Sequence, residues 1–176
     1  MDKELTMKTI RRVAHPDKDH LDDMNLSEKV PALNNQSNEM KFEVFIADDS
    51  TEIRNRLIEM LKENKSIQVI GEAADAEQAM SALRDLKPDV VILDIHMPKG
   101  EGMRVLKDIK TMDPERIAII FTAFPYPQYR QAYLTAGADY FFDKTKDFQK
   151  MADVLDELAE KHFIGRNNDG KRSKPD

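Results

Sequence analysis

Residues 88–102 of the chain, Pro-Asp-Val-Val-Ile-Leu-Asp-Ile-His-Met-Pro-Lys-Gly-Glu-Gly, decide how the rest of the sequence is interpreted. Residues 90–93 form an unbroken run of valine, isoleucine and leucine, which is typical of a strand buried on both faces. Asp94 follows this run directly. Because a buried carboxylate is costly without partners, Asp94 indicates that the strand ends at a cleft, where open α/β sheets bind ligands. This stretch alone leaves open a simpler role, in which Asp94 only caps the following turn.

The composition limits what the protein can be. The chain has 176 residues, enough for one domain with a tail. Its net charge of −6, from 27 basic and 33 acidic residues, argues against direct binding to nucleic acid. It has no cysteine, which excludes disulfides and thiolate chemistry, and no apolar run near the ~20 residues of a membrane span. The sequence therefore predicts a cytoplasmic protein that does not associate with membranes.

Short apolar strands alternate with helical patterns along most of the chain. This order, without a hairpin signal, predicts an α/β fold with a five-stranded doubly wound parallel sheet and helices on both faces. The predicted strands cover residues 42–47, 67–73, 90–93, 117–121 and 138–142, and the predicted helices cover 50–61, 75–86, 103–109, 127–136 and 148–162.

The two ends of the chain lack this alternation of strand and helix patterns. Residues 1–39 lack a strand pattern and end in a polar run, so we expect an N-terminal extension that is partly flexible. Residues 164–176 carry four basic and two acidic side chains, and their composition predicts a disordered basic tail. The predicted domain therefore covers residues 40–163.

Charged or reactive side chains follow four of the predicted strands: Asp48-Asp49, Asp94, Thr122 and Lys144. The carboxyl ends of parallel strands meet at one edge of a sheet, so we expect one shared pocket. Converging carboxylates repel one another, and a hard cation such as Mg2+ relieves that repulsion. The Thr122 hydroxyl and the Lys144 ammonium can hold phosphoryl oxygens, while Asp94 can act as the nucleophile that forms an aspartyl phosphate.

Over about residues 40–163 the sequence resembles a response-regulator receiver domain of two-component signalling, which implies the flavodoxin-like receiver fold. The shared motifs occur in the order of that family. They are the acids Asp48-Asp49, Asp94 followed by Met97-Pro98, the pair Thr122-Ala123, the pair Gly137-Ala138, and Lys144.

The resemblance implies a role for each of these positions. Asp94 would accept a phosphoryl group from a histidine kinase or phosphotransfer protein, and Thr122 and Lys144 would bind its oxygens. Mg2+ would be held by Asp49, Asp94 and the main-chain carbonyl of His96, with Asp48 assisting through water. Phe141 takes the place of the aromatic switch residue, and the face around residues 126–160 would bind a downstream protein. A homodimer is left open.

Two features depart from the family pattern. Thr145 follows Lys144 where many members have proline, and residues 164–176 are too few for a DNA-binding helix-turn-helix. The resemblance implies a signalling protein that catalyses only its own phosphoryl transfer and dephosphorylation. The alternative from another class is a Mg2+-dependent phosphohydrolase with an aspartyl nucleophile. Such an enzyme commonly needs a second acid where this chain has His96.

Overall fold

The computed structural model describes residues 41–97 and 102–169, the last four of them as backbone only. The predicted N-terminal extension and residues 170–176 of the predicted tail lie outside the described residues. Strands and helices alternate along the described chain. They are β1 (Phe42–Ala47), α1 (Thr51–Leu61), β2 (Ile67–Ala73), α2 (Ala76–Leu86), β3 (Val90–Leu93), α3 (Gly102–Met112), β4 (Ile117–Thr122), α4 (Pro127–Thr135), β5 (Tyr140–Asp143) and α5 (Phe148–Asp169).

The strands form one parallel sheet in the order β2-β1-β3-β4-β5, which confirms the predicted fold class. The chain moves outward from β1 to β2, then crosses back to β3 on the other side of β1. The strand order therefore reverses between β1 and β3. In sheets of this kind the crevice for a ligand lies at that point, beyond the carboxyl ends of the two strands.

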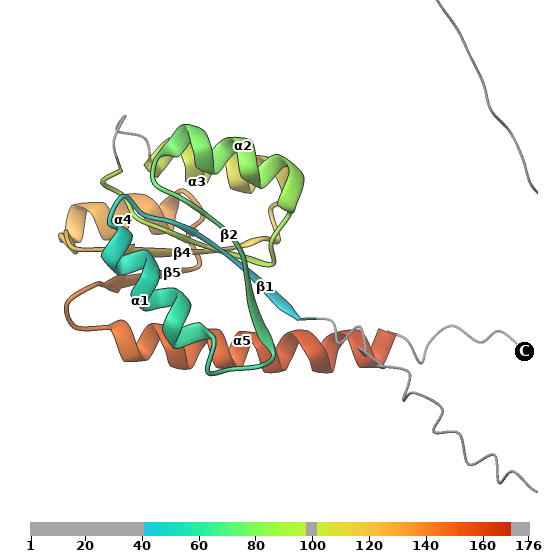
Figure 1. Ribbon diagram of the computed structural model, residues 1–176. Helices are drawn as coiled ribbons and strands as arrows, with labels where there is room; N and C mark the ends of the chain where they lie inside the picture. The colour runs from blue at the N-terminus through green and yellow to red at the C-terminus, as the bar shows by residue number, and fades with distance from the viewer. Residues whose placement is uncertain (1–40, 98–101, 170–176) are drawn as a thin grey trace, which may run out of the picture. The chain divides into compact units, whose positions relative to one another are not determined.

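Helices cover both faces of the sheet (Figure 1), and an apolar cluster lies on each face. One cluster packs α2, α3 and α4 on the sheet, with Leu83, Leu106 and Phe45 among its fully buried members. The other packs α1 and α5 on the opposite face, through residues such as Leu57 and Leu155. Because helices cover both faces, the central strands are apolar without alternation, as all four residues of β3 illustrate.

Local sequence signals set several element boundaries. Ser50 caps α1 by accepting the Ile53 N–H, and Asp75 caps α2 by accepting the Gln78 N–H. The prediction started the last strand at residue 138, whereas β5 starts at Tyr140. Just before β5, the Ala118 N–H donates to the Asp139 carboxylate at 2.8 Å, while the Asp139 N–H donates to the Ala118 carbonyl at 2.9 Å. A side chain therefore takes the place of a backbone acceptor there.

The last helix is longer than the sequence predicted. We expected it to end near His162 and to be followed by a disordered tail, but α5 continues to Asp169. Phe163, one residue beyond the predicted end, still packs against the apolar cluster beneath the sheet, whereas Ile164 is exposed. Residues 164–169 are helical, and that part of the predicted tail was wrong. Among the described residues, no helix combines the length and apolarity needed to cross a membrane.

Candidate functional site

Three acidic residues meet where the strand order reverses. Asp48 and Asp49 follow β1, and Asp94 follows β3, the neighbouring strand in the sheet. The two strand ends are in register, since Ala47 pairs with Leu93, and the Asp94 N–H donates to the Ala47 carbonyl at 2.8 Å. The fold thus brings the predicted acids to one place, with Asp48 and Asp94 buried and Asp49 exposed.

Lys144 joins two of these acids. Its Nζ lies 2.6 Å from Oδ2 of Asp48 and 2.8 Å from Oδ2 of Asp94. The lysine side chain is only 8% exposed, and the two carboxylates are 3% and 6% exposed. Desolvated charges of this kind are stable only when they are paired with good geometry. The Lys144 ammonium therefore fixes the position of the Asp94 carboxylate next to that of Asp48.

The donor set fits a hard divalent cation. One carboxylate oxygen from each of Asp48, Asp49 and Asp94 lies within 4.8 Å of the other two. Burial raises the pKa of Asp48 above its ordinary value, and the hydrogen bond and charge of Lys144 only partly oppose this. Nearby positive charge would favour the ionised carboxylates, and oxygen ligands are those that Mg2+ prefers.

Thr122 ends β4 beside these residues and is completely buried. Its carbonyl accepts the Lys144 N–H at 2.9 Å, and its Oγ1 accepts the Phe124 N–H at 3.1 Å. The predicted pair of phosphoryl-binding residues is therefore linked through the backbone at the ends of β4 and β5.

His96 lies two residues after Asp94 and is exposed. Its N–H donates to Oδ1 of Asp94 over 3.3 Å, and its ring lies 4.2 Å from that of Phe124 between centroids. A role of its carbonyl as a metal ligand stays a prediction. The His96 side chain itself belongs to an aromatic group at the edge of the site. The centroid of its ring lies 5.6 Å from that of Tyr129, another member of the group.

Phe141, the predicted switch residue, is buried with 3% exposure in the cluster beneath α4. Arg130 of α4 donates from a guanidinium nitrogen to the Phe141 carbonyl at 2.9 Å, and the guanidinium lies 5.5 Å from the ring centroid. The aromatic ring therefore already points inward in this structure, and Arg130 connects α4 to β5 at that position.

Sequence reasoning missed two residues that support the site. Arg54 is buried in α1 and donates to the Asp48 carbonyl at 2.8 Å, which fixes the backbone of the acidic pair. Its spacing to Leu57 and Leu61, at helical positions of the buried face, was a signal that could have found it. Tyr133 is the buried residue of α4. Burial raises its pKa to about 12, and the charge of Asp94 adds to this shift.

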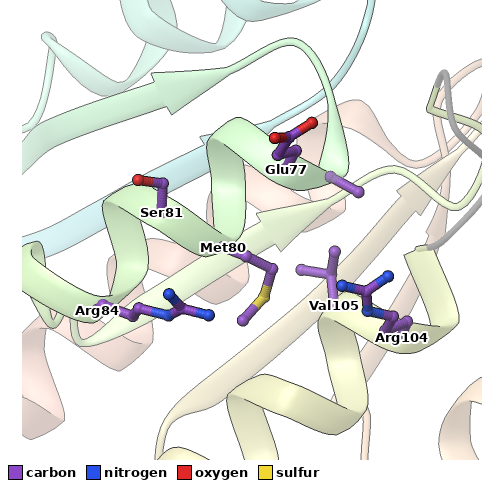
Figure 2. Close-up of a pocket in the computed structure, with 7 residues that line it drawn as sticks. Glu77, Met80, Ser81, Arg84, Arg104 and Val105 are labelled. Carbon is purple, nitrogen blue, oxygen red and sulfur yellow. The ribbon is translucent and has the colours of Figure 1, made fainter.

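A separate surface pocket of about 540 Å³ lies between α2 and α3 (Figure 2). Met80 and Arg84 come from α2, and Arg104 and Val105 come from α3. None of the predicted site residues is among its described lining, so this pocket is distinct from the acidic site.

Known proteins resemble the chain in sequence and in fold. A protein-glutamate methylesterase/protein-glutamine glutaminase of Alkalilimnicola ehrlichii is 32% identical over 123 residues, which cover 69% of this chain and 30% of that protein. Protein CcdB of Bacillus subtilis is 35% identical over 116 residues, which cover 64% of this chain and 96% of that protein. The response regulator domain of Thermotoga maritima CheB matches the fold with a TM-score of 0.60 at 26% identity, covering 69% of this chain and 95% of that domain.

The matches to the methylesterases concern only part of those proteins. The chain spans about a third of their length, between 30% and 36% in three of them. The response regulator receiver domain family matches residues 44–156, which include all the predicted site residues. The chain therefore belongs to the response-regulator receiver family of two-component signalling.

Proposed function

We propose that the chain accepts a phosphoryl group on Asp94 from a histidine kinase or phosphotransfer protein, in a reaction that needs Mg2+. The observation that carries this proposal is the position of the Lys144 ammonium, 2.8 Å from Asp94 and 2.6 Å from Asp48 in a buried pocket. The pocket presents a carboxylate nucleophile, a cation beside it and further oxygen ligands for a metal.

Each residue of the pocket has its own role in the transfer of the phosphoryl group. An Asp94 oxygen attacks the phosphorus of a phosphohistidine, the P–N bond breaks, and the histidine nitrogen leaves with the electron pair. Lys144 moves its charge from the carboxylate to the oxygens of the arriving group, and Thr122 donates its hydroxyl to one of them. Asp49, Asp94 and the main-chain carbonyl of His96 would hold Mg2+, with Asp48 assisting through water, and the ion would neutralise charge on the phosphoryl oxygens.

The partners follow from this chemistry. The phosphodonor would be a protein that presents a phosphohistidine, and the reaction would take place in the cytoplasm, where ATP is available to charge the kinase. A downstream protein would bind the face around residues 126–160. The methylesterase activity in the names of several relatives belongs to those whole proteins and is not proposed for this chain.

Purified protein tests the proposal with acetyl phosphate as the donor. We expect stoichiometric incorporation of one phosphoryl group with Mg2+ and none after chelation of the metal with EDTA. The same samples are tested for turnover of p-nitrophenyl phosphate. Continuous turnover of that ester, without a stable phosphoprotein, would favour the phosphohydrolase and contradict a switch.

Replacing Thr122 by alanine should separate phosphorylation from switching. The variant keeps Asp94 and Lys144 and should still take up beryllofluoride, a mimic of the phosphoryl group. It lacks the hydroxyl that would move toward the charge of the bound beryllofluoride. The change in conformation over α4, β5 and α5, which is a shift between two populations, should therefore be mostly lost. We expect amide chemical-shift changes over residues 126–160 to fall severalfold relative to the wild type. Equal changes in Thr122→Ala and in the control Thr111→Ala would refute the coupling.

The aromatic pair at the edge of the site should slow loss of the phosphoryl group. The rings of His96 and Phe124 lie 4.2 Å apart, and Phe124 has no polar group to orient an attacking water. Replacing Phe124 by asparagine should shorten the lifetime of the aspartyl phosphate by about tenfold, a barrier change of roughly 1.4 kcal/mol. Tyr126→Asn is the control, because Tyr126 is 52% exposed and contacts Phe124 rather than His96. Hydrolysis of the wild type within seconds would be evidence against this account.

A further inference from the structure

The turn after β5, which carries Lys144, is held by hydrogen bonds that the phosphoryl chemistry itself does not use. Asp143 is the last residue of β5 and is buried. Its Oδ1 accepts two hydrogen bonds from Thr145, one from the backbone N–H at 2.8 Å and one from the hydroxyl at 2.6 Å. Its own N–H donates to Oδ2 of Asp147 at 3.2 Å. Hydrogen bonds of side chains therefore connect Asp143, which precedes Lys144, with Thr145 and Asp147, which follow it.

These bonds satisfy the Asp143 carboxylate without the lysine next to it. A buried carboxylate that lacked donors would attract a nearby ammonium, and the charge of Lys146 already acts on Asp143. Thr145 supplies the donors instead, and its hydrogen bonds hold the pKa of Asp143 below the ordinary value of 3.8. The Lys144 ammonium, on the residue between Asp143 and Thr145, bonds instead to Asp48 and Asp94 in the pocket.

The backbone of the turn is fixed by the same residues. The Asp143 carbonyl accepts the N–H groups of Lys146 and Asp147, at 3.2 and 2.8 Å, and the Lys144 N–H donates to the Thr122 carbonyl. Cis peptide bonds are absent from the described residues, so the bond between Lys144 and Thr145 is trans. The Thr145 N–H is itself a donor to Asp143, and a proline at this position would remove it. Threonine at 145 thus builds this turn with hydrogen bonds.

We propose that Asp143 and Thr145 are positioning residues for Lys144, and that the Thr145 hydroxyl sets how fast Asp94 takes up a phosphoryl group. The effect on rate rests on the proposed function, whereas the effect on the turn does not. A residue that holds a catalytic cation within a few tenths of an ångström affects the rate without touching the reacting atoms.

Two substitutions of Thr145 test the hydroxyl. Thr145→Val removes the hydroxyl at nearly constant volume, and Thr145→Ser restores it. Thr111→Val is the matched control, because the Thr111 hydroxyl donates to the Lys107 carbonyl within α3. We expect uptake of phosphate from acetyl phosphate to slow about tenfold in Thr145→Val, as for loss of one hydrogen bond to a charged group. Uptake should be unchanged in Thr145→Ser and Thr111→Val.

Hydrogen exchange of the Lys144 amide gives a second readout that does not need phosphorylation. In Thr145→Val this amide should exchange about tenfold faster, while the midpoint of thermal unfolding stays near that of Thr111→Val. Unchanged exchange at Lys144 would overturn the proposal, and so would equal slowing of uptake in Thr145→Val and Thr145→Ser. If the wild type takes up no phosphate at all, the proposed function fails, and the exchange data still decide whether Thr145 positions the turn.

Discussion

Replacing Asp94 by asparagine is expected to abolish phosphorylation completely. An amide has no ionised oxygen to attack phosphorus, so the loss should be total rather than partial. Asp94 is 6% exposed and lies 2.8 Å from Lys144, at the centre of the acidic cluster. The measurement is incorporation of radiolabelled phosphate from acetyl phosphate in the presence of Mg2+.

The matched control for this variant is Asp85→Asn. Asp85 is an exposed acid of α2, and this substitution makes the same change in charge. Asp94→Asn should stay folded, because Lys144 keeps its contact with Asp48 at 2.6 Å, and circular dichroism checks this. Label in folded Asp94→Asn at the level of Asp85→Asn would show that another residue is the acceptor.

Replacing Gly102 by alanine is expected to lower the free energy of unfolding by roughly 1–3 kcal/mol and to slow phosphorylation. Gly102 starts α3 and is buried against the backbone that follows β3. A Cβ at this residue would lie 2.8 Å from the Ile95 Cα and 2.9 Å from the Asp94 carbonyl oxygen. Both are backbone atoms, which cannot rotate away, so either α3 or the backbone of Asp94 must move.

Gly165→Ala provides the opposite case in the same protein. Gly165 lies within α5, and a Cβ there would meet no atom within 4 Å. Alanine should therefore raise the free energy of unfolding by about 0.5–1 kcal/mol through better helix propensity. Urea unfolding with fitted m-values compares the two variants. If Gly102→Ala proves as stable as Gly165→Ala and is phosphorylated at the wild-type rate, the close contact with Asp94 has no consequence.

Much of the fold was predictable because its signals are local or follow from sheet geometry. The apolar run before Asp94 predicted a fully buried strand, and the helices predicted over residues 50–61 and 75–86 match α1 and α2 to within one residue. The convergence of Asp48, Asp49 and Asp94 followed from a parallel sheet, in which strand ends share one edge.

The contacts that sequence could not give are those between distant segments. Arg130 bonds to the Phe141 carbonyl because the fold brings α4 and β5 together. Phe163, just past the predicted end of α5, packs against the cluster beneath the sheet. The hydrogen bond between Asp143 and Thr145 is local in sequence. Its proposed effect depends on the fold, because Lys144 contacts two acids that follow other strands. Tertiary partners decided each of these features.

Chemical mapping of the phosphoprotein tests whether Asp94 is the phosphoacceptor. Wild-type protein is incubated with acetyl phosphate and Mg2+, reduced with borohydride, which converts an aspartyl phosphate to homoserine, and digested for mass spectrometry. We expect homoserine at position 94, and unchanged aspartate at positions 48, 49 and 143. Homoserine at one of those other positions, or a phosphoryl group on a side chain that is not an aspartate, would contradict the account.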